Sequence, residues 1–282
     1  MQSFTQVRAE SRRVIRERIG RLLDKVVVGT LTGATGSSIS LEALKLYPDE
    51  SFAGRIVSVV TGTGAGQERI IVDSDQQDGV AFVSPNWTTP PTAGATVEIW
   101  AEDLTPSRVN EAINLAILEA QEIVNVPVRV HPESISADRL ELELPDELIK
   151  VSGLLYRQSG GAFMQYEALE ADWTREHPKG YVLLGRTLYV SPAVPSEVLD
   201  ADLWIAGYTL VPLLETDDAT AQLPSDYLVF FAAALLEAGE AGSPVVDPTG
   251  HAARSALWQR QALLIRDRMA TAFAPNTVDV GF

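Results

Sequence analysis

The spacing of apolar residues changes repeatedly along this 282-residue chain, and these changes restrict its possible folds more than any single motif does. Between the stretches with helical spacing lie segments rich in Gly, Thr, Ser, Val and Ile, with short apolar runs separated by turns. The spacing typical of helices occurs in four stretches: 4–28, 105–125, 224–238 and 248–269. The sequence therefore predicts an α+β protein in which two β regions interrupt a bundle of four helices.

The first predicted helix, which ends near Val28-Gly29, is basic in an otherwise acidic chain. Residues 1–28 carry a net charge of +4, whereas the whole chain carries −16. Such a basic stripe either contacts nucleic acid or, more commonly, is a solvated face or pairs with acidic neighbours. The remaining acidic body is poorly suited to holding DNA, because affinity for DNA depends mainly on neutralising phosphates.

Residues 29–101 are predicted to form a small β domain inserted between the first two helices. Four short apolar runs read as strands: GRIVSVV, ERIIV, VAFV and TVEIW. The shift in composition at both ends predicts that this domain is separable from a helical core formed by residues 1–28 and 102–282. A second β excursion, over 128–211, contains the alternating run LELEL (140–144), a hairpin over 180–192 that turns at Gly185-Arg186, and a strand over 201–210.

The three later helices have recognisable starts. Thr105-Pro106 supplies a capping residue and a proline in the first turn, and Pro224 and Asp247-Pro248 open the other two. The helix over 224–238 is so apolar that it needs cover on every side, from its own chain or from a neighbour. The predicted buried stripes are Val109, Ala112, Ile113, Ala116, Ile117, Ala120 and Ile123 in the second helix, and Ala252, Leu257, Leu264, Ile265 and Met269 in the last.

The stretch TGTGAGQERIIV (61–72) contains three glycines in five positions and resembles a phosphate-binding loop. A phosphate loop leads into a helix, whose N-terminal amides hold the anion. Here the following ERIIV favours a strand, and the glycine spacing does not match either nucleotide-binding motif. We therefore predict a hairpin turn in which the glycines adopt positive φ.

The stretch DSDQQDG offers Asp73, Asp75 and Asp78 as calcium ligands. An EF-hand loop needs glycine at its sixth position and glutamate at its twelfth, which are Asp78 and Ser84 here. Asp78-Gly79 between two strands instead predicts a turn.

No other constellation points to catalysis. The three histidines, His131, His177 and His251, are scattered and read as isolated surface residues. The carboxylates Glu141, Glu143, Asp146 and Glu147 read as solvated, and the five tryptophans are dispersed. With no cysteine there is no thiolate nucleophile and no thiolate metal site. We expect a protein that is not an enzyme and that uses no cofactor and no metal.

Composition also bears on location. No run approaches the ~18 consecutive apolar residues of a membrane span, so we expect no membrane association. The first twenty residues lack the apolar core of a signal peptide, and the absence of cysteine fits assembly in a cytoplasm.

Residues 140–270 resemble the head–tail adaptor, or connector, proteins of tailed bacteriophages. The segments that carry the resemblance are, in order, LELPDELIKVSGLLYR, YEALEADWTREHP, GYVLLGRTLYVSPAVP, LWIAGYTLVPLL, LPSDYLVFFAAALLEAGEAG and ALWQRQALLIRDRMA. The β segment from GRIVSVV to TVEI is similar to small β modules of phage structural proteins.

The resemblance implies a helical-bundle protomer that assembles as a ring, usually a dodecamer, below the portal protein at the head–tail junction of the virion. Such a ring extends the DNA channel and is a platform for tail or neck proteins, such as a tail terminator or stopper. Double-stranded DNA passes through it without specific binding. Two alternatives stay open: another phage tail, baseplate or host-binding protein, with residues 29–101 as the binding part, and a hydrolase acting on cell wall or glycan.

The segment Ala274–Phe282 is predicted to dock on a partner, most naturally the portal. Pro275 prevents a smooth continuation of the preceding helix. Beyond it, apolar residues then alternate with Asp279 and Gly281, which is the period of an extended strand with one apolar face. The alternative is a disordered end. The docking residues are Val278, Asp279, Val280, Gly281 and Phe282.

Overall fold

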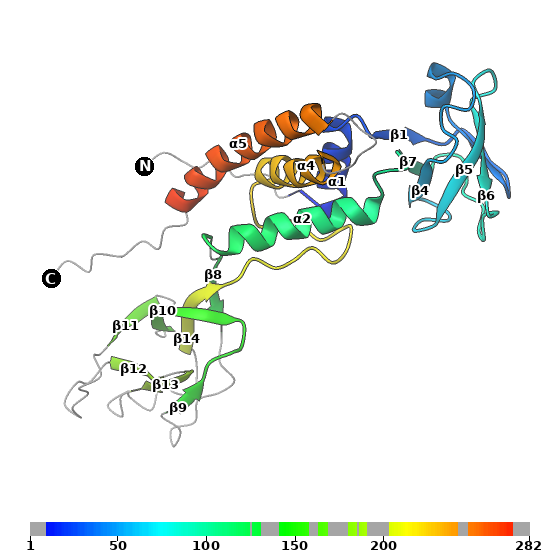
Figure 1. Ribbon diagram of the computed structural model, residues 1–282. Helices are drawn as coiled ribbons and strands as arrows, with labels where there is room; N and C mark the ends of the chain where they lie inside the picture. Colours follow the sequence, from blue (N-terminus) through cyan, green and yellow to red (C-terminus); the bar gives the residue numbers. More distant parts are fainter. Residues whose placement is uncertain are drawn as a thin grey trace. The chain divides into compact units, whose positions relative to one another are not determined.

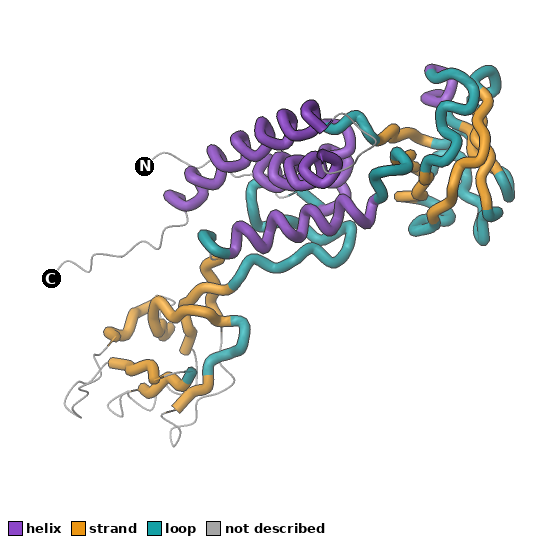
Figure 2. Tube along the Cα trace, in the orientation of Figure 1, coloured by secondary structure: helices purple, strands orange, loops and turns teal. Residues whose placement is uncertain are grey.

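The computed structural model describes residues 10–124, 126–130, 141–157, 163–168, 180–184, 186–190, 203–241 and 248–272. The chain divides into two compact units (Figure 1). Unit 1 comprises Met1–Glu119 and Leu213–Arg268, and unit 2 comprises Ala120–Pro212 and Met269–Phe282. The described residues include four α-helices and two seven-stranded sheets, so the expected mixed α+β class is confirmed (Figure 2).

The first sheet belongs to unit 1 and has the strand order β1-β7-β4-β5-β6-β3-β2. All its pairings are antiparallel. Its strands are β1 (Val26–Thr30), β2 (Gly33–Ala34), β3 (Ser38–Ser40), β4 (Ile56–Thr61), β5 (Glu68–Asp75), β6 (Val80–Ser84) and β7 (Thr96–Trp100), with a 3-10 helix η1 (Glu42–Leu46) between β3 and β4. The four predicted strands correspond to β4–β7, whereas the short β1, β2 and β3 were not predicted.

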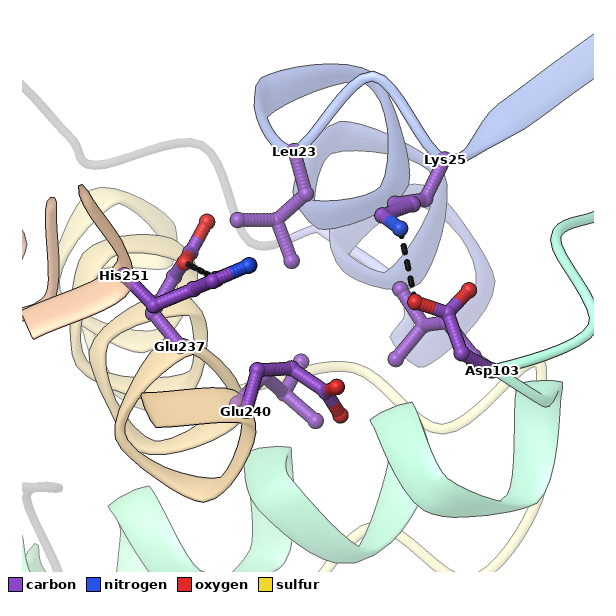
Figure 3. A pocket seen from close by; sticks show the side chains of 8 residues that line it. Leu23, Lys25, Asp103, Glu237, Glu240 and His251 are labelled. Carbon is purple, nitrogen blue, oxygen red and sulfur yellow. Dashed lines mark hydrogen bonds and ion pairs between the residues drawn. The ribbon is translucent and has the colours of Figure 1, made fainter. Parts of the chain in front are cut away.

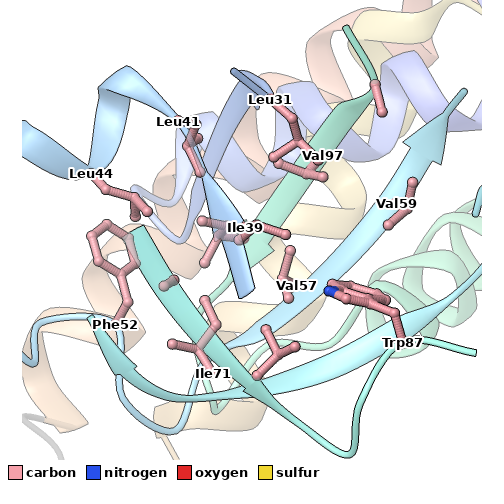
Figure 4. Close-up of a cluster of buried hydrophobic side chains, with 14 residues drawn as sticks. Leu31, Ile39, Leu41, Leu44, Phe52, Val57, Val59, Ile71, Trp87 and Val97 are labelled. Atoms are coloured by element: carbon pink, nitrogen blue, oxygen red, sulfur yellow. The ribbon is translucent and has the colours of Figure 1, made fainter. Parts of the chain in front are cut away.

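One face of this sheet encloses an apolar core (Figure 4). Alternate residues of β4 and β7 point into it, among them Val57, Val59, Val97 and Ile99, and all four are almost fully buried. Phe52 and Trp87 add two large side chains from the connecting loops. The buried residues of this core all lie within 31–99, and Val27 of β1 packs against them, so the β region has its own hydrophobic interior.

The second sheet belongs to unit 2 and has the order β8-β14-β10-β11-β12-β13-β9. The pairing of β11 with β12 is parallel, and the other pairings are antiparallel. Its strands are β8 (Val126–Val130), β9 (Glu141–Glu143), β10 (Leu148–Arg157), β11 (Phe163–Ala168), β12 (Gly180–Leu184), β13 (Thr187–Val190) and β14 (Leu203–Thr209). The predicted hairpin is confirmed, because β12 and β13 pair antiparallel and their pairing reaches Leu184 and Thr187; Gly185 lies outside the described residues.

The helices are α1 (Arg12–Leu22), α2 (Pro106–Gln121), α4 (Ser225–Ala241) and α5 (Pro248–Ala272). Helix α2 begins as predicted, since the Thr105 hydroxyl accepts a hydrogen bond from the Arg108 backbone N–H at 3.2 Å. Its predicted stripe is buried except for Ile123, which lies beyond the helix end and is partly exposed.

The predicted extent of the first helix is wrong at its C-terminal end. Helix α1 stops at Leu22, and Asp24 adopts a positive φ of 55°. The following Val26, Val27 and Val28 form strand β1 instead of a helical turn. Three consecutive β-branched residues favour the strand, and pairing with β7 satisfies their backbone groups. Residues 1–9 lie outside the described part of the chain.

The apolar helix α4 is covered by its own chain. It packs against α1. The Tyr227 hydroxyl donates to the Ala116 carbonyl of α2, and Ser255 of α5 donates to the Ala234 carbonyl at 2.9 Å. Phe230 also stacks on Trp258 of α5 with ring centroids 5.7 Å apart. The need for cover that the sequence showed is therefore met within one protomer, so α4 by itself no longer argues for a neighbouring subunit.

The predicted buried stripe of α5 is mostly wrong. Of its five residues only Met269 is buried, and Leu257 and Leu264 are 48% and 50% exposed. The buried line instead runs through His251, Ala262 and Met269. The sequence pattern missed this line because it begins with a polar residue, whose partner lies on another helix.

Candidate functional site

The basic helix α1 meets acidic residues from two distant parts of the chain. Arg16 is almost fully buried, and both its terminal nitrogens donate to the Asp217 carboxylate at 2.9 Å. Its Nη2 atom also lies 3.3 Å from Oε2 of Glu98, which is fully buried in β7. The same Glu98 oxygen accepts a hydrogen bond from the indole N–H of Trp100 at 3.0 Å. One arginine thus joins α1 to the first sheet and to the segment that precedes α4.

Four further basic residues of the stripe, Arg12, Arg18, Arg21 and Lys25, are paired as well. Arg12 donates to Asp217 and to the Leu214 carbonyl, and Arg18 pairs with Glu10 and with Asp226 of α4. Two further pairs join Arg21 to Glu17 and Lys25 to Asp103. Of the alternatives for this stripe, these contacts support pairing with acidic neighbours.

Burial and charge shift the pKa values of this network in opposite directions. Burial raises the pKa of Glu98 and outweighs the attraction of Arg16 and the hydrogen bond from Trp100. Burial alone would also raise the pKa of Asp217, but its hydrogen bonds and charge interactions with Arg16 and Arg12 outweigh it and lower that pKa. The contribution of Glu98 to the free energy of unfolding therefore decreases as pH rises through its folded pKa. The contribution of Asp217 decreases as pH falls through its folded pKa.

An open groove of about 310 Å³ lies beside this network. It is lined by Arg12, Arg16, Ser58, Val59, Val60, Gly66, Glu68, Pro106, Ser107, Asn110 and Asp217. Although two arginines face it, both already bond to Asp217, and Glu68 adds a further negative charge. The groove is therefore not arranged to hold an anion.

A second buried charged cluster joins α4 to α5 (Figure 3). Glu237 and His251 are both buried, and the Nδ1 atom of His251 hydrogen-bonds the Glu237 carboxylate. Arg254 donates to the other carboxylate oxygen at 2.9 Å. Nearby, Glu240 pairs with Arg108 of α2. The prediction that His251 is a surface residue is wrong, because it packs against α4, where the buried Glu237 supplies its hydrogen-bond partner.

The cavity at this cluster is too small for a ligand. Its volume is about 20 Å³, which suits roughly one water molecule. It is lined by Leu23, Lys25, Asp103, Leu104, Leu236, Glu237, Glu240 and His251 (Figure 3). The cluster therefore orients α5 against α4 and does not form a substrate pocket.

The glycine-rich stretch is a hairpin loop, as predicted. It connects β4 to β5, and Gly62, Gly64 and Gly66 all have positive φ. The Gly66 N–H donates to the Val59 carbonyl at 2.8 Å, and the Gln67 side chain donates to the carbonyl of Gly64. No helix follows whose N-terminus could hold a phosphate, because β5 begins at Glu68.

The aspartate-rich stretch is also a turn. Gly79 has a φ of 65° between β5 and β6, and the Asp78 N–H donates to the Asp75 carboxylate at 3.1 Å. Within the described ranges, no three His, Asp or Glu side chains are grouped so that they could hold a metal ion.

The other predicted residues fall into two groups. Glu143, Asp146 and Glu147 are exposed, and Asp146 pairs with Arg186. His131, His177, Trp173, the side chain of Glu141 and the docking segment 274–282 lie outside the described residues. Among the helices that the structure describes, none is both long and apolar enough to cross a membrane.

Sequence reasoning missed Glu98, Asp217 and Glu237, the three acids around which the helices are arranged. Glu98 alternates with Val97 and Ile99, which reads as an outward residue of a half-buried strand. The only available signal was its neighbour Trp100, two residues on and therefore on the same face. A tryptophan on a supposedly solvated face indicates that another element covers it.

Comparison with known families decides the identity. The model of the SU10 adaptor protein family matches residues 92–279, about two thirds of the chain. The chain belongs to the SU10 adaptor protein family. It is therefore a structural adaptor protein of a bacteriophage and a component of the virion. A search of curated proteins finds no match.

The family match divides the adaptor at an informative place. It begins at residue 92, just before β7, and includes Glu98, Asp217 and Glu237. Helix α1 and strands β1–β6 precede it. Arg16 thus connects a part of the adaptor outside the matched region to two acids within it.

Proposed function

We propose that this adaptor forms a ring directly below the portal, at the head–tail junction of the virion. The ring, a dodecamer by the resemblance described above, extends the DNA channel and is the platform to which tail or neck proteins attach, such as a tail terminator or stopper. The observation that carries the proposal is the SU10 adaptor match over residues 92–279. The role is structural, with no catalysis and no cofactor, and assembly takes place in the host cytoplasm.

The contacts among α1, α2, α4 and α5 support a helical-bundle core for this protomer. Helix α4 contacts each of the other three, through Asp226 to α1, Tyr227 to α2 and Glu237 to α5. Two buried hydrogen bonds fix the relative position of the helices: Tyr227 to the Ala116 carbonyl, and His251 to Glu237. A rigid protomer of this kind suits a part that must keep its shape while DNA moves past it.

The charge of the adaptor supports passage of DNA without specific binding. The net charge is −16, and Arg12, Arg16, Arg18 and Arg21 of α1 are all engaged in ion pairs with the adaptor's own acids. An arginine already paired adds little to phosphate neutralisation, on which DNA affinity depends. We therefore expect acidic side chains on the channel wall.

Imaging of assembled particles tests the proposal. Virions that carry a tagged adaptor should show several copies arranged in a closed ring between portal and tail, and particles lacking the adaptor should have filled heads without attached tails. A single copy at the neck, or adaptor density only at the distal end of the tail, would contradict the proposal.

Deletion of Val278–Phe282 is expected to abolish attachment to the portal with little change in the thermal stability of the protomer. Three apolar side chains in five residues contribute roughly 5–8 kcal/mol on burial. Ordering about nine residues costs on the order of 10 kcal/mol or more, so pairing along a strand edge and many copies in a ring must supply the remainder. Sedimentation with adaptor-free heads measures attachment. A truncated adaptor that joins heads at the normal level would show that the segment does not dock.

A second candidate is a host-binding or other tail or baseplate protein. It is favoured by the first sheet, most of which precedes the matched region. Under this alternative, removal of the sheet would leave head attachment intact and abolish binding to the host cell surface.

A further inference from the structure

Helix α2 has an exposed face that carries leucines. Glu111, Leu115 and Leu118 follow one another at intervals of four and three residues, so they lie along one side of the helix. Leu115 is 54% exposed and Leu118 is 45% exposed, although the opposite side of α2 is buried. Glu111 is exposed beside them and forms no ion pair with any described residue. We call these three residues the α2 face.

Helix α5 has a matching face of opposite charge. Leu257, Arg260 and Leu264 follow one another at intervals of three and four residues, and both leucines are about half exposed. Arg260 is exposed and makes no ion pair within the described ranges. The helix as a whole carries four arginines and one aspartate, in a chain whose net charge is −16. We call these three residues the α5 face.

Single exposed leucines are common on protein surfaces and need no explanation. Here two pairs of leucines lie on two different helices of unit 1, each pair with a charge of opposite sign. Both faces are exposed in the same protomer, so they do not cover each other within one chain. Two different complementary patches are what a head-to-tail contact between identical subunits requires, whereas a two-fold dimer uses one patch twice.

We propose that the α2 face of one copy of this adaptor packs on the α5 face of the next copy, and that this contact closes the ring. The leucines form the apolar centre of the interface, and Glu111 pairs with Arg260 of the neighbouring copy. This inference rests on the proposed function, because it specifies which surfaces join the subunits. Charge complementarity selects a second copy as the occupant. DNA would be attracted to Arg260 but would gain nothing from the leucines beside it.

Disulfide crosslinking tests the contact, since the chain has no cysteine of its own. A Leu118→Cys, Leu264→Cys double variant, incorporated into virions and oxidised, should give a ladder of covalent multimers on a non-reducing gel. Each single variant should give no multimers beyond the wild-type background. Leu46→Cys, on η1 and 80% exposed, is the control for crosslinking by exposure alone.

Charge reversal tests the same contact independently. Glu111→Arg and Arg260→Glu should each lower incorporation into virions by about tenfold, because a buried attraction becomes a repulsion. The double variant Glu111→Arg, Arg260→Glu should recover to near the wild-type level, since the pair is restored in the opposite sense. Glu42→Arg, an exposed reversal on η1, should have no effect. Circular dichroism and melting curves confirm that each variant is folded.

The outcomes separate this interface from the ring itself. If imaging shows a ring but no ladder forms and the reversals have no effect, the interface is wrong and the ring stands. Dimers from Leu118→Cys alone would indicate a symmetric contact and overturn the proposal. Loss on Arg260→Glu without recovery in the double variant would indicate that α5 contacts DNA or another protein. Absence of any ring in wild-type virions would overturn both proposals.

Discussion

Replacing Arg16 with methionine is expected to destabilise the adaptor by about 3–5 kcal/mol, because it leaves the fully buried Glu98 without a counter-charge. The total stability of a domain is roughly 5–15 kcal/mol, so this loss is a large share of it. Chemical denaturation at neutral pH, followed by circular dichroism, measures the change. Arg21→Met is the matched control: Arg21 lies on the same helix, but its ion pair with Glu17 is largely exposed and contributes at most about 1 kcal/mol.

A second substitution separates charge from packing in this prediction. Glu98→Gln in the Arg16→Met background should recover most of the lost stability, since glutamine is neutral and still accepts the Trp100 hydrogen bond. The deficit of Arg16→Met should also shrink as pH is lowered towards the range in which Glu98 takes up a proton, because the buried charge then disappears. If the free energy of unfolding of Arg16→Met is within about 1 kcal/mol of the wild-type value at neutral pH, the Arg16–Glu98 ion pair does not stabilise the adaptor.

The second large effect is a difference between two excisions of the first sheet. The shorter excision removes most of the sheet but keeps β1 and β7. Thr30 of β1 and Thr96 of β7 are register partners, so a two-residue Asn-Gly turn in place of residues 31–95 would convert these strands into a hairpin. Val97 and Ile99, which face the removed core, would be changed to threonine. This variant should remain soluble and melt cooperatively, because Glu98 and Trp100 still pack against α1.

A longer excision is the matched control. Replacement of residues 30–101 by a Gly/Ser linker removes Glu98 and the fully buried Trp100, which lies against Gly20 so closely that an added Cβ atom would be 2.7 Å from its ring. Loss of a buried tryptophan alone costs about 3–5 kcal/mol. We therefore expect the longer excision to unfold or aggregate, so that the separable part is shorter than the residues 29–101 that the sequence predicts and excludes β7. Equal behaviour of the two variants would show that β1 and β7 do not stabilise the helices, and failure of both would show that the β domain is not separable.

Where both partners of an interaction lie close together in the sequence, the sequence alone was sufficient to predict the local structure. The Thr105-Pro106 start of α2, the turns at Gly62–Gly66 and Asp78-Gly79, and the β12–β13 hairpin all follow from residues within a few positions of one another. The same holds for the segments that indicated a phage adaptor, which the family match supports.

Tertiary structure decided the features that depend on distant partners. Glu98 has the sequence pattern of a solvated strand residue, yet α1, some 80 positions earlier, covers it. His251 reads as an isolated surface residue until Glu237 of α4 approaches it, and their pairing turns Leu257 and Leu264 outward. Burial of a polar side chain requires a partner, and that partner is set by how the helices pack. Periodicity in the sequence shows that a helix has an apolar side, but the pairing of buried charges determines which side faces solvent in the protomer.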